Sequence, residues 1–237
     1  MRALIFTLIF FAGLSSGIHA ANLPPWFVSL REAVYGQQLT ANQIEPMARE
    51  AAARANAELS GSDLFVMLSR IEFMMGRAYQ NDERNRDAAN RYSEGLRWAE
   101  RALQEGPSAE AWEMMSVNIA QSSVVRSTLF AMTNGLRVER YARNALAINS
   151  RNATAQHMIA GRWVFAPAPF NNLERGLDMM KAILSESDMD DHERFNTYAA
   201  IGFAYVQMRR PQEARPWVAR ALEIYPTNKF ALSLLDS

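Results

Sequence analysis

The chain has 237 residues, of which 49% are hydrophobic and 21% are charged, so it is long and apolar enough to bury a core. Lysine plus arginine and aspartate plus glutamate number 25 each, and this balance argues against nucleic acid as a partner, because phosphate binding draws on a basic excess. The sequence contains no cysteine, which excludes disulfides and a lipid anchor on cysteine.

The first twenty residues, MRALIFTLIFFAGLSSGIHA, have the features of a secretory signal peptide. Arg2 precedes an apolar run from Ala3 to Ile18, and the small residue Ala20 follows. The run is short for a helix that spans a bilayer. We therefore expect residues 1–20 to be a signal peptide cleaved after Ala20, with retention as an anchor as the alternative. The mature domain, residues 21–237, is then expected in a bacterial periplasm without a stable membrane span.

Small residues recur in pairs along the rest of the chain. The first members of the pairs are Gly36, Gly76, Ser116, Gly161 and Gly202, and the second members are Ala55, Ala102, Ala145, Ala182 and Ala221. Successive first members lie 40, 40, 45 and 41 residues apart. Two helices that pack closely need a small residue where their backbones approach, so this spacing predicts five helical hairpins.

The last unit, residues 198–226, shows the pattern most fully. Its large and small residues from 198 to 205 follow the three-and-four spacing of one helical face, and those from 214 to 221 do the same. Pro211 can begin the second helix, because the first position of a helix does not need an N–H. Pro226 is expected to end that helix.

This unit resembles the tetratricopeptide repeat (TPR). The signature positions of that family are occupied in order by Tyr198, Ile201, Gly202, Tyr205, Ala214, Val218, Ala221 and Pro226. The second and third units carry insertions, and Arg175 replaces a small residue in the fourth, so the chain resembles an irregular, exported bacterial member. The resemblance covers roughly residues 25–236. It implies an all-α, right-handed TPR-like helical-repeat solenoid of about five hairpins, with a short C-terminal capping helix in NKFALSLL, as a single domain.

In the TPR family the first helix of each hairpin lines a concave inner wall. The resemblance places these residues on that wall as candidates for partner binding: Arg70, Phe73, Arg77, Gln80, Glu110, Glu113, Met158, Arg162, Phe165, Phe203 and Gln207, together with Val117 and Asn196. Arginine can grip a carboxylate and aromatic rings supply contact area, so a peptide end or an extended segment is the expected ligand. The alternative is that these are ordinary solvated helix positions.

The sequence gives little support to catalysis. After signal removal only His157 and His192 remain, and His157 stands at a packing position of the repeat, which favours a core or half-buried histidine. The acidic segment SDMDDHERF, residues 187–195, lacks the glycine and the glutamate of a calcium loop and is expected to cap a helix. Enzyme, metal and cofactor motifs are missing. We therefore expect a non-catalytic protein with no cofactor and no metal.

Two further segments are unusual. FAPAPFNN, residues 165–172, is expected to form a turn whose Phe170 tucks under the adjacent hairpin, with a contact point for a partner as the alternative. Residues 122–135 carry an apolar stripe of Val125, Leu129 and Met132, which we expect to fill the core rather than to form an exposed interface.

Two functions are compatible with these observations. The first is a periplasmic adaptor or scaffold that binds a protein or peptide of the cell envelope on its concave face, with homo-oligomerisation left open. The second is a ligand-binding accessory of a periplasmic solute transporter, resembling the TPR proteins associated with tripartite, ATP-independent transporters. The examples of that class carry a lipid-anchored cysteine, which this chain lacks. An open groove would favour the adaptor, and a closed apolar channel would favour the accessory.

Overall fold

The computed structural model describes residues 23–187 and 189–236, and the regular structure of these residues is entirely helical. The predicted signal peptide, residues 1–20, lies outside the described residues. In chain order the helices are α1 (Pro25–Gly36), α2 (Ala41–Glu58), α3 (Gly61–Asn81), α4 (Asn85–Glu105), α5 (Ala109–Val125), α6 (Thr128–Ile148), α7 (Ala153–Phe165), α8 (Leu173–Glu186), α9 (Asp191–Gln207), α10 (Pro211–Ile224) and α11 (Lys229–Ser233).

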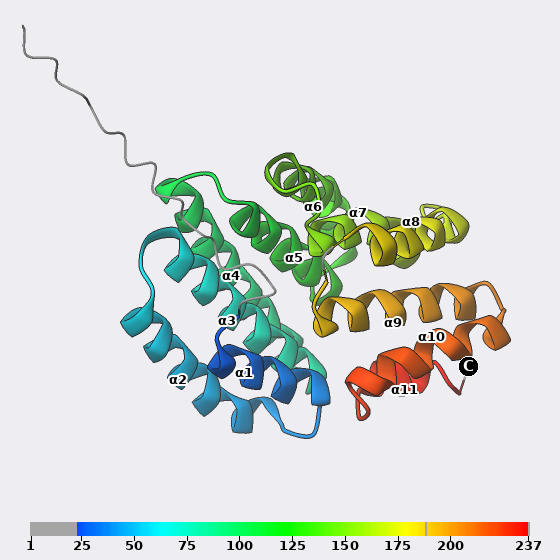
Figure 1. The fold of residues 1–237 in the computed structure, drawn as a ribbon, viewed down its shortest axis with the longest axis horizontal. Coiled ribbons are helices and arrows are strands. Elements are labelled where there is room, and N and C mark those ends of the chain that lie inside the picture. The colour runs from blue at the N-terminus through cyan, green and yellow to red at the C-terminus, as the bar shows by residue number, and fades with distance from the viewer. Residues whose placement is uncertain (1–22, 188, 237) are drawn as a thin grey trace, which may run out of the picture.

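Within the described ranges, α1 to α10 form five hairpins and the short helix α11 follows the last of them (Figure 1). The repeat spacing is thereby confirmed, and the architecture is that of an all-α, TPR-like solenoid. The predicted punctuation is also confirmed, because Pro211 occupies the first turn of α10 and that helix ends at Ile224, before Pro226. Local signals therefore define where the helices begin and end.

Two of the recurring glycines, Gly76 and Gly202, lie where the two helices of a hairpin make close contact. A Cβ atom added to Gly76 of α3 would lie 2.3 Å from Cε1 of Tyr92 on α4, and one added to Gly202 of α9 would lie 2.7 Å from Cγ2 of Val218 on α10. Tyr92 and Val218 are both fully buried. Any side chain at either glycine would overlap a packed neighbour on the partner helix.

The first helices of adjacent hairpins form an inner layer. Contacts join α1 to α3, α3 to α5, α5 to α7 and α7 to α9, while each second helix packs between its own hairpin partner and the next first helix. Such a layer is what stacked hairpins produce when each buries its apolar face against its neighbours. The inner layer supplies the walls of the cavity described below.

The two ends of the solenoid meet, which the repeat pattern does not predict. Tyr35 of α1 stacks on Tyr225 at the end of α10, with ring centroids 5.5 Å apart, and contacts Phe195 of α9 edge-on at 5.8 Å. The Nδ2 atom of Asn228 donates to the carbonyl of Tyr35 at 2.9 Å, and Thr227 donates to the carbonyl of Gly36. The first and last hairpins thus share one hydrophobic core, and α1 lies beside α10 and α11 in Figure 1.

The expectation that the apolar stripe of residues 122–135 fills the core is wrong for two of its three members. Leu129 and Met132 of α6 are 70% and 72% exposed, whereas Val125 is half-buried against the core. The reason is length, because α6 has 21 residues and the following helix α7 has only 13, so α7 is too short to cover the whole of its neighbour.

Phe170 also departs from expectation, because its side chain is 69% exposed and does not tuck under a hairpin. Its backbone N–H donates to the carbonyl of Pro167 at 2.9 Å, which closes a tight turn at the surface. Separately, none of the helices in residues 23–187 and 189–236 combines the length and the apolar character needed to cross a membrane.

Candidate functional site

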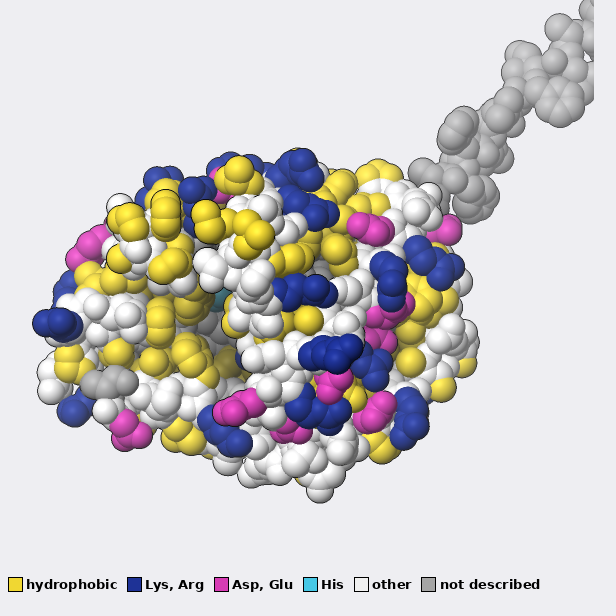
Figure 2. Space-filling view, turned by 180° about the vertical axis from the view of Figure 1, so that it is seen from behind, with side chains coloured by type: hydrophobic (Ala, Val, Ile, Leu, Met, Phe, Trp, Pro, Cys, Tyr) yellow, Lys and Arg dark blue, Asp and Glu magenta, His cyan; other side chains and the backbone are white. Residues whose placement is uncertain are grey.

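A cavity of about 150 Å³ lies inside the layer of first helices. All five of these helices contribute side chains to it, from Arg31 of α1 to Glu193 of α9. In Figure 2 the face seen from behind is hollowed, with apolar side chains along the walls and a histidine visible in the hollow. Because His157 and His192 are the histidines of the described residues and both line the cavity, this hollow leads into it.

Part of the predicted inner wall converges on this cavity. Four of the candidate residues, Arg70, Phe73, Glu113 and Met158, line it, and so do Val117 and Asn196. They come from α3, α5, α7 and α9, which are far apart in sequence. The TPR register therefore places these side chains correctly, while their role in binding a partner stays a prediction.

Arg77 and Gln80 lie beside the cavity, packed into the wall itself. Nη1 of Arg77 donates to Oε1 of Gln80 at 3.4 Å and to Oε1 of Gln121 at 3.3 Å, and the guanidinium lies over the ring of Tyr35. Gln80 also accepts a hydrogen bond from the hydroxyl of Tyr92 at 2.7 Å. These contacts hold α3 to its neighbours, so the two side chains already have structural partners.

The remaining candidates lie away from the cavity. Glu110 is buried and accepts a hydrogen bond from Ser108 at the start of α5. Arg162 donates from the surface to Glu139 of α6 at 2.8 Å. Phe165 and Phe203 pack on each other, with ring centroids 5.3 Å apart, and Gln207 is exposed at the end of α9. These positions face other surfaces because the helix register alone does not fix how each hairpin is rotated in the stack.

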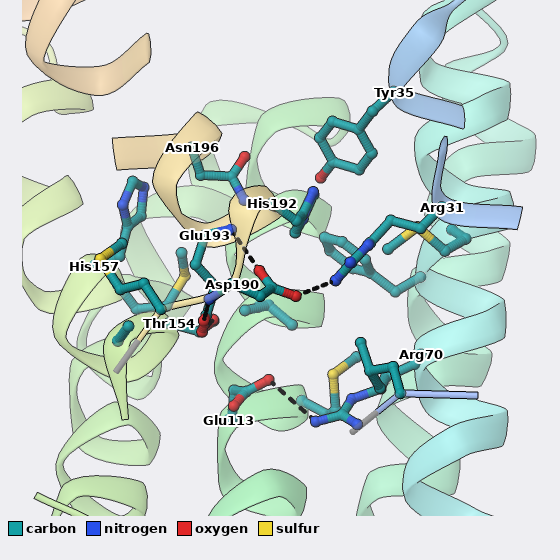
Figure 3. Close-up of a pocket in the computed structure, with 18 of the residues that line it drawn as sticks. Arg31, Tyr35, Arg70, Glu113, Thr154, His157, Asp190, His192, Glu193 and Asn196 are labelled. Atoms are coloured by element: carbon teal, nitrogen blue, oxygen red, sulfur yellow. Dashed lines mark hydrogen bonds and ion pairs between the residues drawn. The ribbon is translucent and has the colours of Figure 1, made fainter. Parts of the chain in front are cut away.

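Polar contacts connect the inner helices across the cavity (Figure 3). Nη1 of Arg31 on α1 pairs with Oδ2 of Asp190 at 2.6 Å, and Nη2 of Arg70 on α3 lies 3.8 Å from Oε1 of Glu113 on α5. The other oxygen of Glu113 accepts from Nδ2 of Asn152 at 2.8 Å. These side chains are 15% exposed or less, and buried charges of this kind are stable only when they are paired.

The acidic segment before α9 acts as a helix cap, as expected. Asp190 is the N-cap residue, and its carboxylate accepts from the backbone N–H of Glu193 at 2.9 Å. In return, Oε2 of Glu193 accepts from the backbone N–H of Asp190 at 3.0 Å, which completes a capping box. Oε1 of Glu193 accepts from the hydroxyl of Thr154 on α7 at 2.9 Å. The cap therefore also places two carboxylates at the wall of the cavity.

Burial shifts the pKa of the groups around the cavity. Desolvation, reinforced by the nearby charges of Glu113 and Asp190, raises the pKa of Glu193 to about 7. Desolvation also raises the pKa of Glu113 and lowers the pKa of His157 to about 4. The pKa of His192 is lowered for the same reason, with a contribution from the Arg31 charge. Both histidines are therefore neutral near pH 7.

The two histidines differ in their partners. Nδ1 of His192 lies 3.3 Å from the hydroxyl of Tyr225, and its Nε2 lies 3.1 Å from Nδ2 of Asn196. The Nδ1 atom of His157 is buried and has no hydrogen-bond partner within the described residues. The expectation of a half-buried packing histidine describes the exposure of His157, but its unpaired nitrogen at the cavity is a feature that only the structure shows.

Sequence reasoning missed the contribution of α1 to this site. Arg31 and Tyr35 line the cavity because the first hairpin packs against the last, and the predicted wall began only at the second hairpin. Asp190 and Glu193 were recognised as a cap but not as cavity residues. The capping-box pattern could have revealed their position in the cavity. It fixes the carboxylate of Glu193 in the first turn of a helix that was expected to line the wall.

No three histidine, aspartate or glutamate side chains of the described ranges are grouped so that they could hold a metal ion. The chemistry that the arrangement offers is recognition, because the cavity presents paired charges, hydrogen-bond acceptors and an apolar wall of phenylalanine and methionine side chains. Its volume suits a group of a few heavy atoms.

A comparison of the sequence with known protein families shows which family the chain belongs to. Residues 37–187, more than half of the 237, match the family described as regulator of microtubule dynamics protein 1-3. The chain belongs to this family. The matched span runs from the end of α1 to the end of α8, so Arg31, Asp190 and Glu193 lie outside the part on which family membership rests.

Other comparisons add little about this member of the regulator of microtubule dynamics family. No curated protein matches the sequence significantly. A solved structure, that of YrrB, described as a TPR protein with an unusual peptide-binding site, is 14% identical and covers 83% of this chain and 89% of its own, with a TM-score of 0.39. No residue of the site is transferred from it.

Proposed function

We propose that the protein is a non-catalytic interaction module of the cell envelope, an adaptor that holds a segment of a partner protein at its inner cavity. The observation that carries the proposal is that all five first helices contribute to one cavity. Such convergence creates a site that belongs to the whole solenoid rather than to any single repeat. The description of the family as regulators is in keeping with a role in binding rather than in catalysis.

The size of the cavity limits which part of a partner protein can enter it. A volume of about 150 Å³ accommodates one side chain or one chain end, but not an extended segment. The partner is therefore expected to insert a single anchoring group, while the rest of its segment lies on the rim. Anchor residues in fully desolvated pockets carry most of the binding free energy in many protein interfaces.

The envelope location is part of the proposal and draws on the sequence alone. The twenty N-terminal residues have the features of a signal peptide, and the lack of cysteine removes any dependence on a redox compartment. Fractionation of cells that produce the full chain tests it. Recovery of a shortened protein from the periplasm is expected, and recovery of uncleaved protein from the cytoplasm would contradict it.

The second candidate is the ligand-binding accessory of a solute transporter. The observation that favours it is the contact between the first and last hairpins, because this contact adds a wall of α1 side chains to the cavity. Its lining, however, contains three carboxylates and two guanidiniums, whereas a closed apolar channel would be expected for that role. The adaptor is therefore the better supported of the two functions.

Site-specific crosslinking separates these functions. A photo-reactive amino acid at Met158, inside the cavity, is expected to crosslink to one defined envelope protein in living cells. The same amino acid at Gln212, which is exposed on α10, is the matched control and should not give that product. If the Met158 position crosslinks to no protein while a small molecule copurifies in native mass spectrometry, the adaptor is wrong and the accessory is favoured.

A further inference from the structure

The charges of the cavity are unequal, and this imbalance points to the chemistry of its ligand. Three carboxylates line it, those of Glu113, Asp190 and Glu193, against the two guanidiniums of Arg31 and Arg70. Each guanidinium already faces a carboxylate, Arg31 that of Asp190 and Arg70 that of Glu113. The lining therefore carries one more negative charge than positive charge when all three carboxylates are ionised, which disfavours an anionic ligand.

Glu193 is the carboxylate with no cation as its hydrogen-bond partner. Its two oxygens accept from the hydroxyl of Thr154 at 2.9 Å and from the backbone N–H of Asp190 at 3.0 Å, and both donors are neutral. The side chain is buried, with the residue only 9% exposed. An ionised carboxylate in such a place is stabilised strongly by a positive charge brought into the cavity.

His157 provides a second and independent indication. Its Nδ1 atom is buried, has no hydrogen-bond partner within the described residues and belongs to a side chain that lines the cavity. The neutral imidazole carries one nitrogen that can accept a hydrogen bond. Figure 3 shows His157 and Glu193 on the same side of the cavity, away from Arg31 and Arg70. A ligand that donates several hydrogen bonds can satisfy both groups.

The rest of the wall suits an alkyl chain. Phe73 of α3, Met114 of α5, Met158 of α7 and Met189 before α9 contribute apolar surface to the same cavity. Methionine side chains adapt to unbranched chains, because they are flexible and polarisable. A cavity of about 150 Å³ can hold four methylene groups and an ammonium group.

We propose that the cavity binds a primary alkylammonium group, with the ammonium at Glu193 and His157 and the methylene chain along the methionine side chains. This inference rests on the proposed function and deepens it, because it identifies the anchoring group of the partner segment as a lysine side chain. It replaces the arginine-to-carboxylate recognition expected from the sequence, since both cavity arginines are already paired with carboxylates of the protein.

Protons compete with the ligand for Glu193. The charged and titratable groups that line the cavity with it are Arg31 and Tyr35 from α1, Arg70 from α3, Glu113 from α5, His157 from α7, and Asp190 and His192 at the start of α9. The guanidinium of Arg77 from α3 lies beside them, over the ring of Tyr35. Both histidines stay neutral between pH 6 and 8, because burial lowers their pKa. Burial also raises the pKa of Glu113, an effect that its contacts with Arg70 and Asn152 oppose. Glu193 has a pKa of about 7, so the fraction of Glu193 that is ionised falls about tenfold between pH 8 and pH 6.

The test uses n-butylammonium as the probe and the full-length protein with methyl-labelled methionine. Resonances of Met114, Met158 and Met189 are expected to shift and saturate at millimolar butylammonium, at least tenfold more tightly than with n-butanol, its uncharged analogue. Binding should weaken about tenfold from pH 8 to pH 6. Equal binding of butanol, a pH-independent affinity or no saturable shift would each overturn the inference.

A matched pair of variants locates the ammonium. Glu193→Gln keeps an oxygen for the backbone N–H of Asp190 and removes the charge, so it should lose at least tenfold in affinity for butylammonium. Glu186→Gln, at an exposed carboxylate near the end of α8, should bind as the unmodified protein does. If Glu193→Gln binds equally well, the assignment is wrong. If the crosslink from Met158 to a protein nevertheless persists, the adaptor function stands without the ammonium site.

Discussion

The raised pKa of Glu193 predicts that replacing this residue with glutamine stabilises the protein at alkaline pH. The pKa of about 7 in the folded protein compares with 4.5 for an ordinary glutamate. Each pKa unit corresponds to about 1.36 kcal/mol, so ionised Glu193 costs about 3 kcal/mol of folding free energy above pH 7. The cost is not reduced much by solvent, because Glu193 is only 9% exposed.

The sign of the pH dependence follows from proton binding. Between about pH 4.5 and pH 7 the folded protein holds a proton on Glu193 that the unfolded chain has released, so stability from this group falls as the pH rises through that window. Glu193→Gln cannot ionise and escapes this loss. Its amide oxygen can still accept from Asp190 and its amide NH₂ can donate to Thr154, so the contacts at the start of α9 persist.

Urea unfolding at pH 5, 6, 7 and 8 measures the effect. The stability of Glu193→Gln relative to the unmodified protein is expected to increase by about 2 to 3 kcal/mol from pH 5 to pH 8. Glu186→Gln, at an exposed carboxylate, should show no such trend. A difference that stays constant across these pH values would refute the argument, because it would mean that Glu193 has the same pKa in the folded and unfolded states.

The remaining predictions concern packing and closure. Gly76→Ala should cost about 2 kcal/mol in urea unfolding, because its Cβ would lie 2.3 Å from the buried ring of Tyr92. Gly135→Ala, where no atom lies within 4 Å of the added Cβ, should instead gain about 0.5 to 1 kcal/mol, and equal effects would contradict the packing argument. Asn228→Ala should cost about 1 to 3 kcal/mol, because it leaves the carbonyl of Tyr35 without its donor and removes the side-chain cap of α11, and an unchanged unfolding midpoint would show that neither contact contributes.

Much of the fold could be read from the sequence, because its signals are local. A small residue at the crossing of two helices, a proline at the start of α10 and an acidic cap before α9 each act within about one hairpin. The structure confirms the proline and the cap, and it confirms the close crossing at Gly76 and Gly202 but not at Gly36 or Gly161. The same register brought Arg70, Phe73, Glu113 and Met158 to the cavity. The same register also predicted that Arg77 lines the inner wall, but its side chain packs against Gln121 within that wall. Helical periodicity predicts which face of a helix a residue lies on, but it does not predict which neighbouring side chains cover that face.

The apolar residues of α6 give a second example of a helical face whose neighbours periodicity does not predict. The spacing of Leu129 and Met132 identifies a common helical face correctly, yet both side chains are exposed. Whether such a face is covered depends on the length and position of α7, which the residues of the stripe do not encode. Periodicity therefore predicts that a face is apolar and cannot by itself predict that it is buried.

The sequence by itself determined that this protein is a stack of helical hairpins, because short-range spacing specifies helices and their closest contacts. Only the tertiary structure decided that the ends of the stack meet, since Asn228 and Tyr35 are separated by 193 residues. That closure brings Arg31 to Asp190, and the packing of α5 and α7 brings Glu113 and His157 to Glu193. The raised pKa of Glu193 follows from this assembly, because burial and neighbouring charge are properties of the folded chain.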